Sequence, residues 1–176
     1  MSNFDELSSF LCEKNVTLVA VSKTRSVEEI LALYNRGQRD FGENRVQEMR
    51  DKYEVLPKDI RWHLIGHLQT NKVKYIAEWV HLIHSVDSLP LLEEINKQAQ
   101  KHNRIIPCLL QVYIASEETK FGLDEDELIT LLNSASYKQM QNIAVYGLMG
   151  MATNTENESL IRNEFSHLIQ MFDKIK

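Results

Sequence analysis

The sequence predicts an α/β domain built around a parallel sheet, and three observations carry that prediction. Short apolar runs near residues 16–22, 38–42, 61–65, 80–86, 106–114 and 144–149 alternate with segments of helical period. Polar residues directly follow most of these runs, as in "SKT", "GENR" and "SVDS". No "GxGxxG" turn follows the first run, so a dinucleotide-binding sheet is unsupported. Strand–helix alternation with polar strand ends favours a (β/α)8 TIM-type barrel of the kind whose active face lies at the carboxyl ends of the strands.

The first run, "VTLVAVSKTR" over residues 16–25, follows an N-terminal segment of helical period. Its apolar residues are too closely spaced for a strand with one wet face, which predicts a strand covered on both sides. Lys23 continues this strand on the face of Val19 and Val21.

The helical segments that follow the runs carry their own start and stop signals. Ser26 can cap the helix "SVEEILALYNRG", and Gly37 can end it. Asp87 or Ser88 can cap the helix that follows "HSV". The remaining expected helices are "NRVQEMRDKY", "QTNKVKYIAEW", "DEDELITLLNSASY" and "ENESLIRNEFSHLIQMFDKIK".

About six βα units can be counted, whereas a closed barrel needs eight and about 250 residues. No linker or shift in composition divides the chain. We therefore expect residues 1–176 to form a single barrel domain that is incomplete and lacks its last two βα units.

Composition excludes several classes of function. With 176 residues, 43% of them apolar, the chain can bury one sizeable core. Its net charge of -5 is mixed along the chain, so neither nucleic acid nor an anionic membrane is expected as a partner. No apolar stretch approaches the roughly 20 residues that cross a bilayer, and the start of the chain does not resemble a signal peptide. The two cysteines, Cys12 and Cys108, form no metal motif, which makes a cytoplasmic location the expectation.

Lys23 is the first candidate for chemistry. Facing a barrel interior, its amine would be desolvated, its pKa would fall, and its neutral form could attack an aldehyde to form a Schiff base. The alternative is a lysine that extends from the strand end into water. Lys120, in a polar loop, is a weaker amine candidate.

Four further residues at or near strand ends could surround Lys23. Asn44 ends the "FGEN" run, His63 shares a strand face with Ile65, Ser85 lies within "IHSVDS", and Met149 lies within "GLMGMAT". Each also has an ordinary structural interpretation, as a turn or cap residue or as part of the core.

No metal site is expected from the histidine spacing. His63 and His67 lie on either side of Gly66 at a strand end and do not share a helix face. His81 and His84 are placed on opposite faces of their strand by its alternation.

Six motifs in order, "AVSKT", "FGENRVQE", "WHLIGHLQTNK", "HSVDS", "QVYIASEETKFG" and "GLMGMAT", resemble the signatures of the pyridoxal phosphate homeostasis proteins. These are single-domain relatives of the N-terminal barrel of alanine racemase. The resemblance implies pyridoxal 5'-phosphate as cofactor, held as an aldimine on Lys23. It further implies that Asn44, His63, Ser85 and Met149 line the cofactor, and that the phosphate-binding residues lie beyond Lys176.

The function implied is non-catalytic binding of pyridoxal phosphate for vitamin B6 and amino-acid homeostasis, with apo-enzymes as partners that receive the cofactor. Racemases of this fold use an acid or base on the second face of the cofactor, supplied by a second domain, and no such domain is visible here. The alternatives are a pyridoxal-phosphate-dependent amino-acid racemase and a structural domain whose lysine is incidental.

Overall fold

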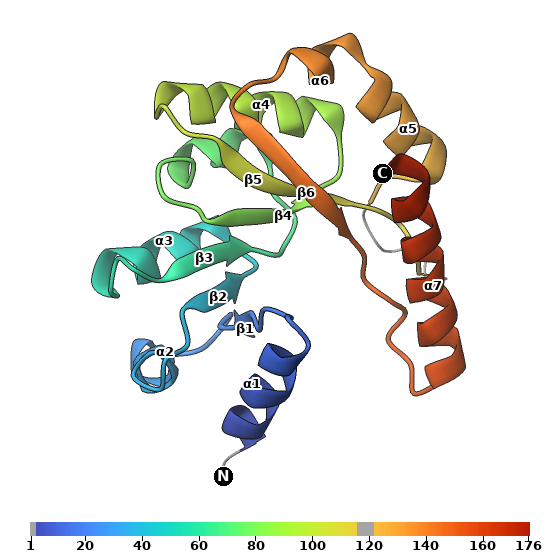
Figure 1. The fold of residues 1–176 in the computed structure, drawn as a ribbon. Coiled ribbons are helices and arrows are strands. Elements are labelled where there is room, and N and C mark those ends of the chain that lie inside the picture. Colours follow the sequence, from blue (N-terminus) through green and yellow to red (C-terminus); the bar gives the residue numbers. More distant parts are fainter. Residues whose placement is uncertain (1–2, 116–121) are drawn as a thin grey trace.

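The computed structural model describes residues 3–115 and 122–176, and within them the chain forms one parallel sheet. The six strands lie side by side in sequence order, β1 to β6, as the series of arrows in Figure 1 shows. The α/β, TIM-type arrangement expected from the sequence is thus confirmed. The strands are β1 (Ala20–Val21), β2 (Asp40–Glu43), β3 (Arg61–Leu64), β4 (Leu82–Val86), β5 (Ile106–Gln111) and β6 (Ile143–Met149).

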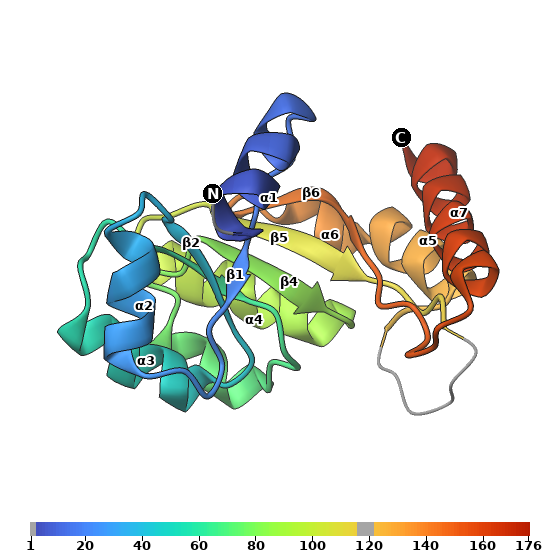
Figure 2. The same cartoon turned by 90° about the horizontal axis from the view of Figure 1, so that it is seen from below.

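Helices connect the strands and cover one face of the sheet. In Figure 2, α2, α3 and α4 lie on the same side of the sheet. In Figure 1, α1 lies beside β1 and α7 beside β6, at the two ends of the strand series. The helical elements are α1 (Asn3–Glu13), α2 (Val27–Tyr34), α3 (Val46–Val55), the short 3-10 helix η1 (Thr70–Tyr75), α4 (Leu89–Lys101), α5 (Glu125–Asn133), α6 (Ala135–Gln139) and α7 (Glu158–Ile175).

Strand alternation separates a helix-facing side of the sheet from an inner side. On β2, Glu43 contacts Lys52 of α3, so Glu43 and Phe41 point toward the helices. Gly42 therefore points inward, where a Cβ would lie 3.1 Å from Val19 and 3.0 Å from Ile65. The inner side is where polar residues near the strand ends can meet.

The core lies mainly between the sheet and its helices. Phe41 and Trp62, paired neighbours on β2 and β3, are 1% and 0% exposed, and their ring centroids are 6.2 Å apart. Tyr53 of α3 stacks on Trp79 with centroids 4.0 Å apart and so ties α3 to the segment after η1. Burial of these aromatic rings supplies much of the apolar area that stabilises the fold.

The first strand differs from its prediction. It forms ladder pairs only at Ala20 and Val21, and Val21 is 52% exposed, so the expectation of a strand covered on both sides is wrong. Within the described residues β1 pairs with β2 alone, which leaves its other edge open. The apolar run predicted strand character correctly but not its edge position.

The helix starts and ends predicted from local sequence signals largely match the structure. Ser26 caps α2 in a full capping box with Glu29, and Gly37 takes a positive φ of 97° beyond the end of that helix. Ser88 occupies the N-cap position of α4, but its side chain makes no capping bond. The predicted helix "QTNKVKYIAEW" is shorter than expected, since only Thr70–Tyr75 is helical and in the 3-10 form. No helix in the described part of the chain is long and apolar enough to span a membrane.

Trp62 provides a direct test of how this core is held. We expect Trp62→Ala to lower the free energy of unfolding by about 3–5 kcal/mol because it empties a fully buried site. The buried indole Nε1 of Trp62 has no hydrogen-bond partner, so Trp62→Phe removes an unsatisfied donor while keeping a ring and should cost less than half as much. Urea unfolding of both variants measures this, and equal losses would contradict it.

Candidate functional site

The turn that carries Lys23 follows β1 directly at the carboxyl edge of the sheet. Its backbone closes through a bond from the Arg25 N–H to the Ser22 carbonyl at 3.0 Å. Thr24 adopts a left-handed φ of 62°, a strained conformation for a β-branched residue. Strain of this kind persists only where surrounding contacts fix the backbone.

Those contacts come from a buried lysine of α3. Lys52 Nζ donates hydrogen bonds of 2.7 Å to the Ser22 carbonyl, to Glu43 Oε1 and to Glu48 Oε1. Ser22 Oγ donates to the same Glu43 oxygen at 2.7 Å, and the Thr24 N–H donates to Glu48 Oε1 at 2.6 Å. The backbone on each side of Lys23 is thus anchored to β2 and α3.

Burial and mutual hydrogen bonds shift the pKa values of the charged groups in this cluster. Burial raises the pKa of Glu43, which is 0% exposed, although bonds from Lys52 and Ser22 act against that rise. Burial alone would lower the pKa of Lys52, but its bonds to Glu43 and Glu48 outweigh burial and leave that pKa raised. Lys52 is therefore a cation, and its removal would leave a buried carboxylate without a counter-charge.

The Lys23 side chain itself is exposed, so the expectation of an amine desolvated inside a barrel is wrong for this chain. Its position follows from the open edge of β1. Among the described residues no carboxylate pairs with it. The exposed amine is accessible to an aldehyde from solvent, and the turn that carries it is anchored.

Asn44 and Ser85 are brought close to one another through Gly66. A Cβ on Gly66 would lie 2.4 Å from the Asn44 carbonyl oxygen, so only glycine permits this approach of two strand ends. Ser85 Oγ donates to the Gly66 carbonyl at 2.6 Å. The strand pairing also sets Lys23 level with Asn44, because Val21 pairs with Gly42 two residues earlier. Lys23, Asn44 and Ser85 thus all lie near the carboxyl edge of the sheet, at or just after the ends of their strands.

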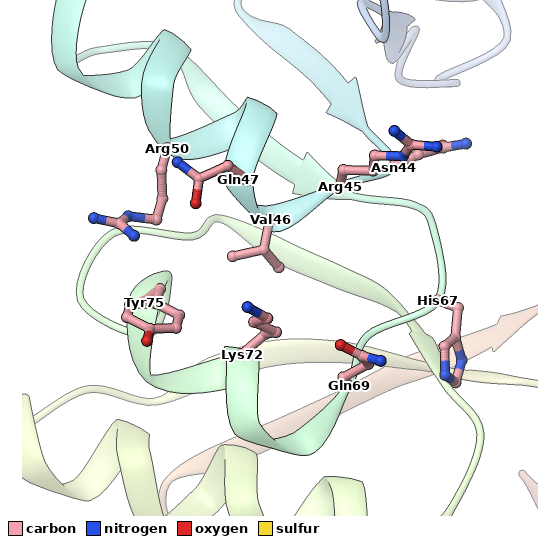
Figure 3. Close-up of a pocket in the computed structure, with 9 residues that line it drawn as sticks. All are labelled: Asn44, Arg45, Val46, Gln47, Arg50, His67, Gln69, Lys72 and Tyr75. Atoms are coloured by element: carbon pink, nitrogen blue, oxygen red, sulfur yellow. The ribbon is translucent and has the colours of Figure 1, made fainter.

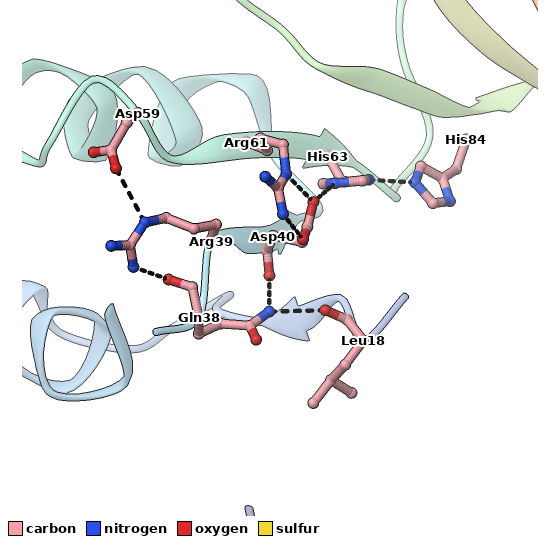
Figure 4. Close-up of polar contacts among 8 residues, drawn as sticks. All are labelled: Leu18, Gln38, Arg39, Asp40, Asp59, Arg61, His63 and His84. Atoms are coloured by element: carbon pink, nitrogen blue, oxygen red, sulfur yellow. Dashed lines mark hydrogen bonds and ion pairs between the residues drawn. The ribbon is translucent and has the colours of Figure 1, made fainter. Parts of the chain in front are cut away.

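His63 lies lower on the inner face, two residues before the level of Asn44. Figure 4 shows it between Asp40 and His84, with Nε2 3.0 Å from Asp40 Oδ1 and Nδ1 2.9 Å from His84 Nε2. Arg61 grips Asp40 with both Nε and a terminal nitrogen, at 2.7 and 2.5 Å. Contact of the His63 ring with a cofactor stays a prediction, since what the structure shows is a hydrogen-bonded core histidine.

His81 and His84 do not lie on opposite faces, contrary to expectation. The ring centroids of both lie close to that of His63, at 5.2 and 5.1 Å, because His81 precedes β4 and is not bound by its alternation. Asp40, His63 and His81 even place potential metal ligands within 4.8 Å of one another. The guanidinium of Arg61, bonded to both Asp40 oxygens, opposes a second cation there, so the cluster favours hydrogen bonding over metal binding.

Met149 ends β6, at the far side of the sheet from β1. It pairs with Gln111 of β5, and its carbonyl accepts a bond from the Val112 N–H at 2.9 Å. Its contact with a cofactor also stays a prediction. Lys120, the weaker amine candidate, lies outside the described residues.

Lys52 and Asp40 were not among the residues predicted from the sequence. Lys52 reads as an ordinary exposed lysine in "MRDKYE", and only its spacing from Glu48, one helical turn away, hinted at a partner. Glu43 within "FGEN" gave the other signal, since a carboxylate among buried strand residues requires a counter-charge.

Comparison with known proteins matches this geometry to a family. The model of the alanine racemase N-terminal domain family matches residues 1–176. The chain is 41% identical over 165 residues to the pyridoxal phosphate homeostasis protein of Aquifex aeolicus, covering 93% of this chain and 72% of that one. It is 37% identical over 163 residues to the Helicobacter pylori protein of the same name, covering 92% and 73%.

Solved structures of similar proteins share the fold of this chain. PipY of Synechococcus elongatus, solved with PLP bound, superposes with a TM-score of 0.84 at 33% identity, covering 97% of this chain and 80% of that one. Alanine racemase of Bartonella henselae, at 19% identity and a TM-score of 0.65, shares the fold, covering 88% of this chain and 44% of that one.

The fold and the family model that matches residues 1–176 define a member of the alanine racemase N-terminal domain class. Within that class the chain belongs to the pyridoxal phosphate homeostasis protein family, which confirms the resemblance seen in its motifs.

Removing the buried cation should destabilise the fold strongly. We expect Lys52→Met to lower the free energy of unfolding by about 3–5 kcal/mol, because Glu43 keeps a buried charge with no counter-ion. The double variant Lys52→Met with Glu43→Leu should recover part of this loss. Urea unfolding measures both, and Lys97→Met, which alters an exposed lysine paired with Glu94, is the control. A double variant less stable than the single one would contradict the account.

Acid should weaken the fold through the histidine cluster. Burial, with His63 and His81 nearby, lowers the pKa of His84 from 6.5 to about 4. The unfolded chain therefore takes up a proton near pH 6.5 that folded His84 accepts only near pH 4. The stability that comes from keeping His84 neutral is fully present above about pH 6.5. It is lost progressively as the pH falls from there to about pH 4.

Urea unfolding at several pH values checks this expectation. In His84→Asn the free energy of unfolding should depend less steeply on pH between about pH 6.5 and pH 4. His102→Asn, which alters an exposed histidine after α4, should keep the wild-type slope. An unchanged slope in His84→Asn would refute the assignment.

Proposed function

We propose that this chain binds pyridoxal 5'-phosphate through Lys23 and acts as a non-catalytic carrier of the cofactor in vitamin B6 and amino-acid homeostasis. The observation that carries the proposal is the anchored turn. Its backbone is fixed at Ser22 and Thr24, while the amine between them is exposed and has no carboxylate partner among the described residues. The homeostasis proteins similar to this chain, and PipY solved with PLP bound, support it.

The residues present fit such a group. Pyridoxal phosphate supplies an aldehyde that combines reversibly with amines. Lys23 provides the amine at the strand edge, and Asn44 and Ser85, joined through Gly66, provide polar groups along the same edge. His63 and Met149 complete the proposed set of contacts.

A carrier is favoured over an amino-acid racemase by the state of the histidines. Racemisation needs a group free to give and take a proton beside the substrate carbon. Both ring nitrogens of His63 are engaged, by Asp40 and His84, and burial lowers its pKa. This leaves His63 poorly suited to that role. Because the similar curated proteins are named homeostasis proteins, we expect no racemase turnover.

The setting of the proposed activity is the cytoplasm, where apo-enzymes that need the cofactor are the partners to which it is passed. A cofactor held by Lys23 would have to leave that lysine for the recipient, so transfer needs an accessible lysine. The exposure of Lys23 meets that requirement.

The covalent attachment is directly testable. We expect Lys23→Ala to abolish the visible absorbance of the bound cofactor and the adduct fixed by borohydride, because no other described lysine combines exposure with this anchored position. Lys101→Ala, which alters an exposed lysine at the end of α4, is the matched control and should keep both signals.

Peptide mass mapping after borohydride reduction identifies the modified lysine. An adduct that persists in Lys23→Ala at the wild-type level would overturn the proposal. Conversion of pure L-alanine to its D form, dependent on Lys23, would replace the carrier with an enzyme.

A further inference from the structure

A cavity lined mostly by polar residues lies beside the strand edge, between the start of α3 and η1. It has a volume of about 400 Å³. Figure 3 shows Arg50 reaching from α3 toward Tyr75, with Lys72 of η1 pointing into the space between the two elements. Arg45 and His67 also line it, and none of its lining residues is an aspartate or a glutamate. A pocket of this size can hold a small metabolite.

Its positive charge is concentrated around one ring. The Arg50 guanidinium carbon lies 4.8 Å from the Tyr75 ring centroid, and the Nζ atoms of Lys72 and Lys74 lie 5.7 and 5.0 Å from it. Each distance allows a cation–π contact. Three cations therefore lie around the ring of Tyr75, and their like charges repel one another.

Like Lys23, Arg50, Lys72 and Lys74 have no carboxylate partner among the described residues, whereas several other cations do. Arg25, Arg36 and Arg39 each pair with a carboxylate within 3.2 Å. In the described part of the chain no ion pair joins Arg50, Lys72 or Lys74 to an acidic residue. The contrast is informative because acidic residues outnumber basic ones, 25 to 20.

From this arrangement we propose that the cavity is a binding site for a small anion with at least two negative charges, of the phosphate-ester or pyrophosphate class. Arg50 and Lys72 supply charge-assisted hydrogen bonds, and the amide of Gln69 supplies a neutral donor at the rim, whereas the Gln47 amide already donates to Asp51 Oδ1 at 2.8 Å. An anion there relieves the repulsion among the three cations.

The site is separate from the one proposed for the cofactor. It lies between two helical elements, whereas Lys23 follows β1, and Asn44 is the one proposed cofactor contact among its lining residues. The inference does not depend on cofactor binding and can be tested in its absence.

The test is titration of the protein with pyrophosphate by isothermal calorimetry at constant ionic strength. We expect saturable binding by the wild-type protein and by Lys23→Ala. The double variant Arg50→Gln with Lys72→Gln should raise Kd at least about tenfold through the loss of two charge-assisted bonds. Lys72→Arg keeps the charge and should bind within about threefold of wild type.

Controls separate a built site from general electrostatics. Lys101→Gln removes one positive charge elsewhere on the surface and should leave Kd unchanged. Lys72 is exposed, so its variants should fold, and circular dichroism verifies this.

Three outcomes would overturn the proposal. One is the absence of saturable binding, and another is equal weakening by Lys101→Gln. The third is binding that survives the double variant but is blocked by pyridoxal phosphate, which would place the anion in the cofactor site.

Discussion

A single buried cation, Lys52, joins the first turn of the protein to the rest of the sheet. Its three hydrogen bonds reach a backbone carbonyl after β1, a carboxylate on β2 and a carboxylate on its own helix. Since β1 contributes only two residues to the ladder, these bonds replace the sheet contacts that a longer strand would have made. The arrangement fixes the backbone around Lys23 without burying its amine, which is what a reversible carrier requires.

The two edges of the sheet serve different purposes as a result. Asp40 and Arg61, the first residues of β2 and β3, lie at the amino edge and hold the inner face together through His63. Lys23 and Asn44 lie at the carboxyl edge, where the backbone is shaped by an anchored turn and by the close approach at Gly66. Under the proposed function, stability and binding are assigned to opposite ends of the strands, as in parallel barrels generally.

Much of the fold was predictable because it depends on local pattern. Strand–helix alternation predicted the order of the strands, and Ser26 and Gly37 marked the ends of α2 correctly. Long-range contacts were not predictable in the same way. The exposure of Val21 depends on which strands flank β1, and the burial of Lys52 depends on Glu43 from another element.

The candidate site was also predictable only where it depends on local pattern. The motifs predicted Lys23 and Asn44 at one edge, and the pairing of β1 with β2 sets them level. The contacts of His63 escaped prediction because His81, which precedes β4, meets its ring from outside the alternation of that strand. Cations gathered around Tyr75 come from both α3 and η1, so no single stretch of sequence displays them.

Amide hydrogen exchange of Thr24 tests most directly whether the Lys52 cluster holds the turn that carries Lys23. The Thr24 N–H bonds to Glu48, which Lys52 holds in place, so its exchange should be slowed by about a hundredfold or more in the wild-type protein. In Lys52→Met, under conditions where the fold persists, that protection should fall while the amide of Arg61 in β3, which donates to the Arg39 carbonyl at 2.8 Å, stays protected. Rapid exchange of Thr24 in the wild-type protein, or equal protection in the variant, would contradict the account.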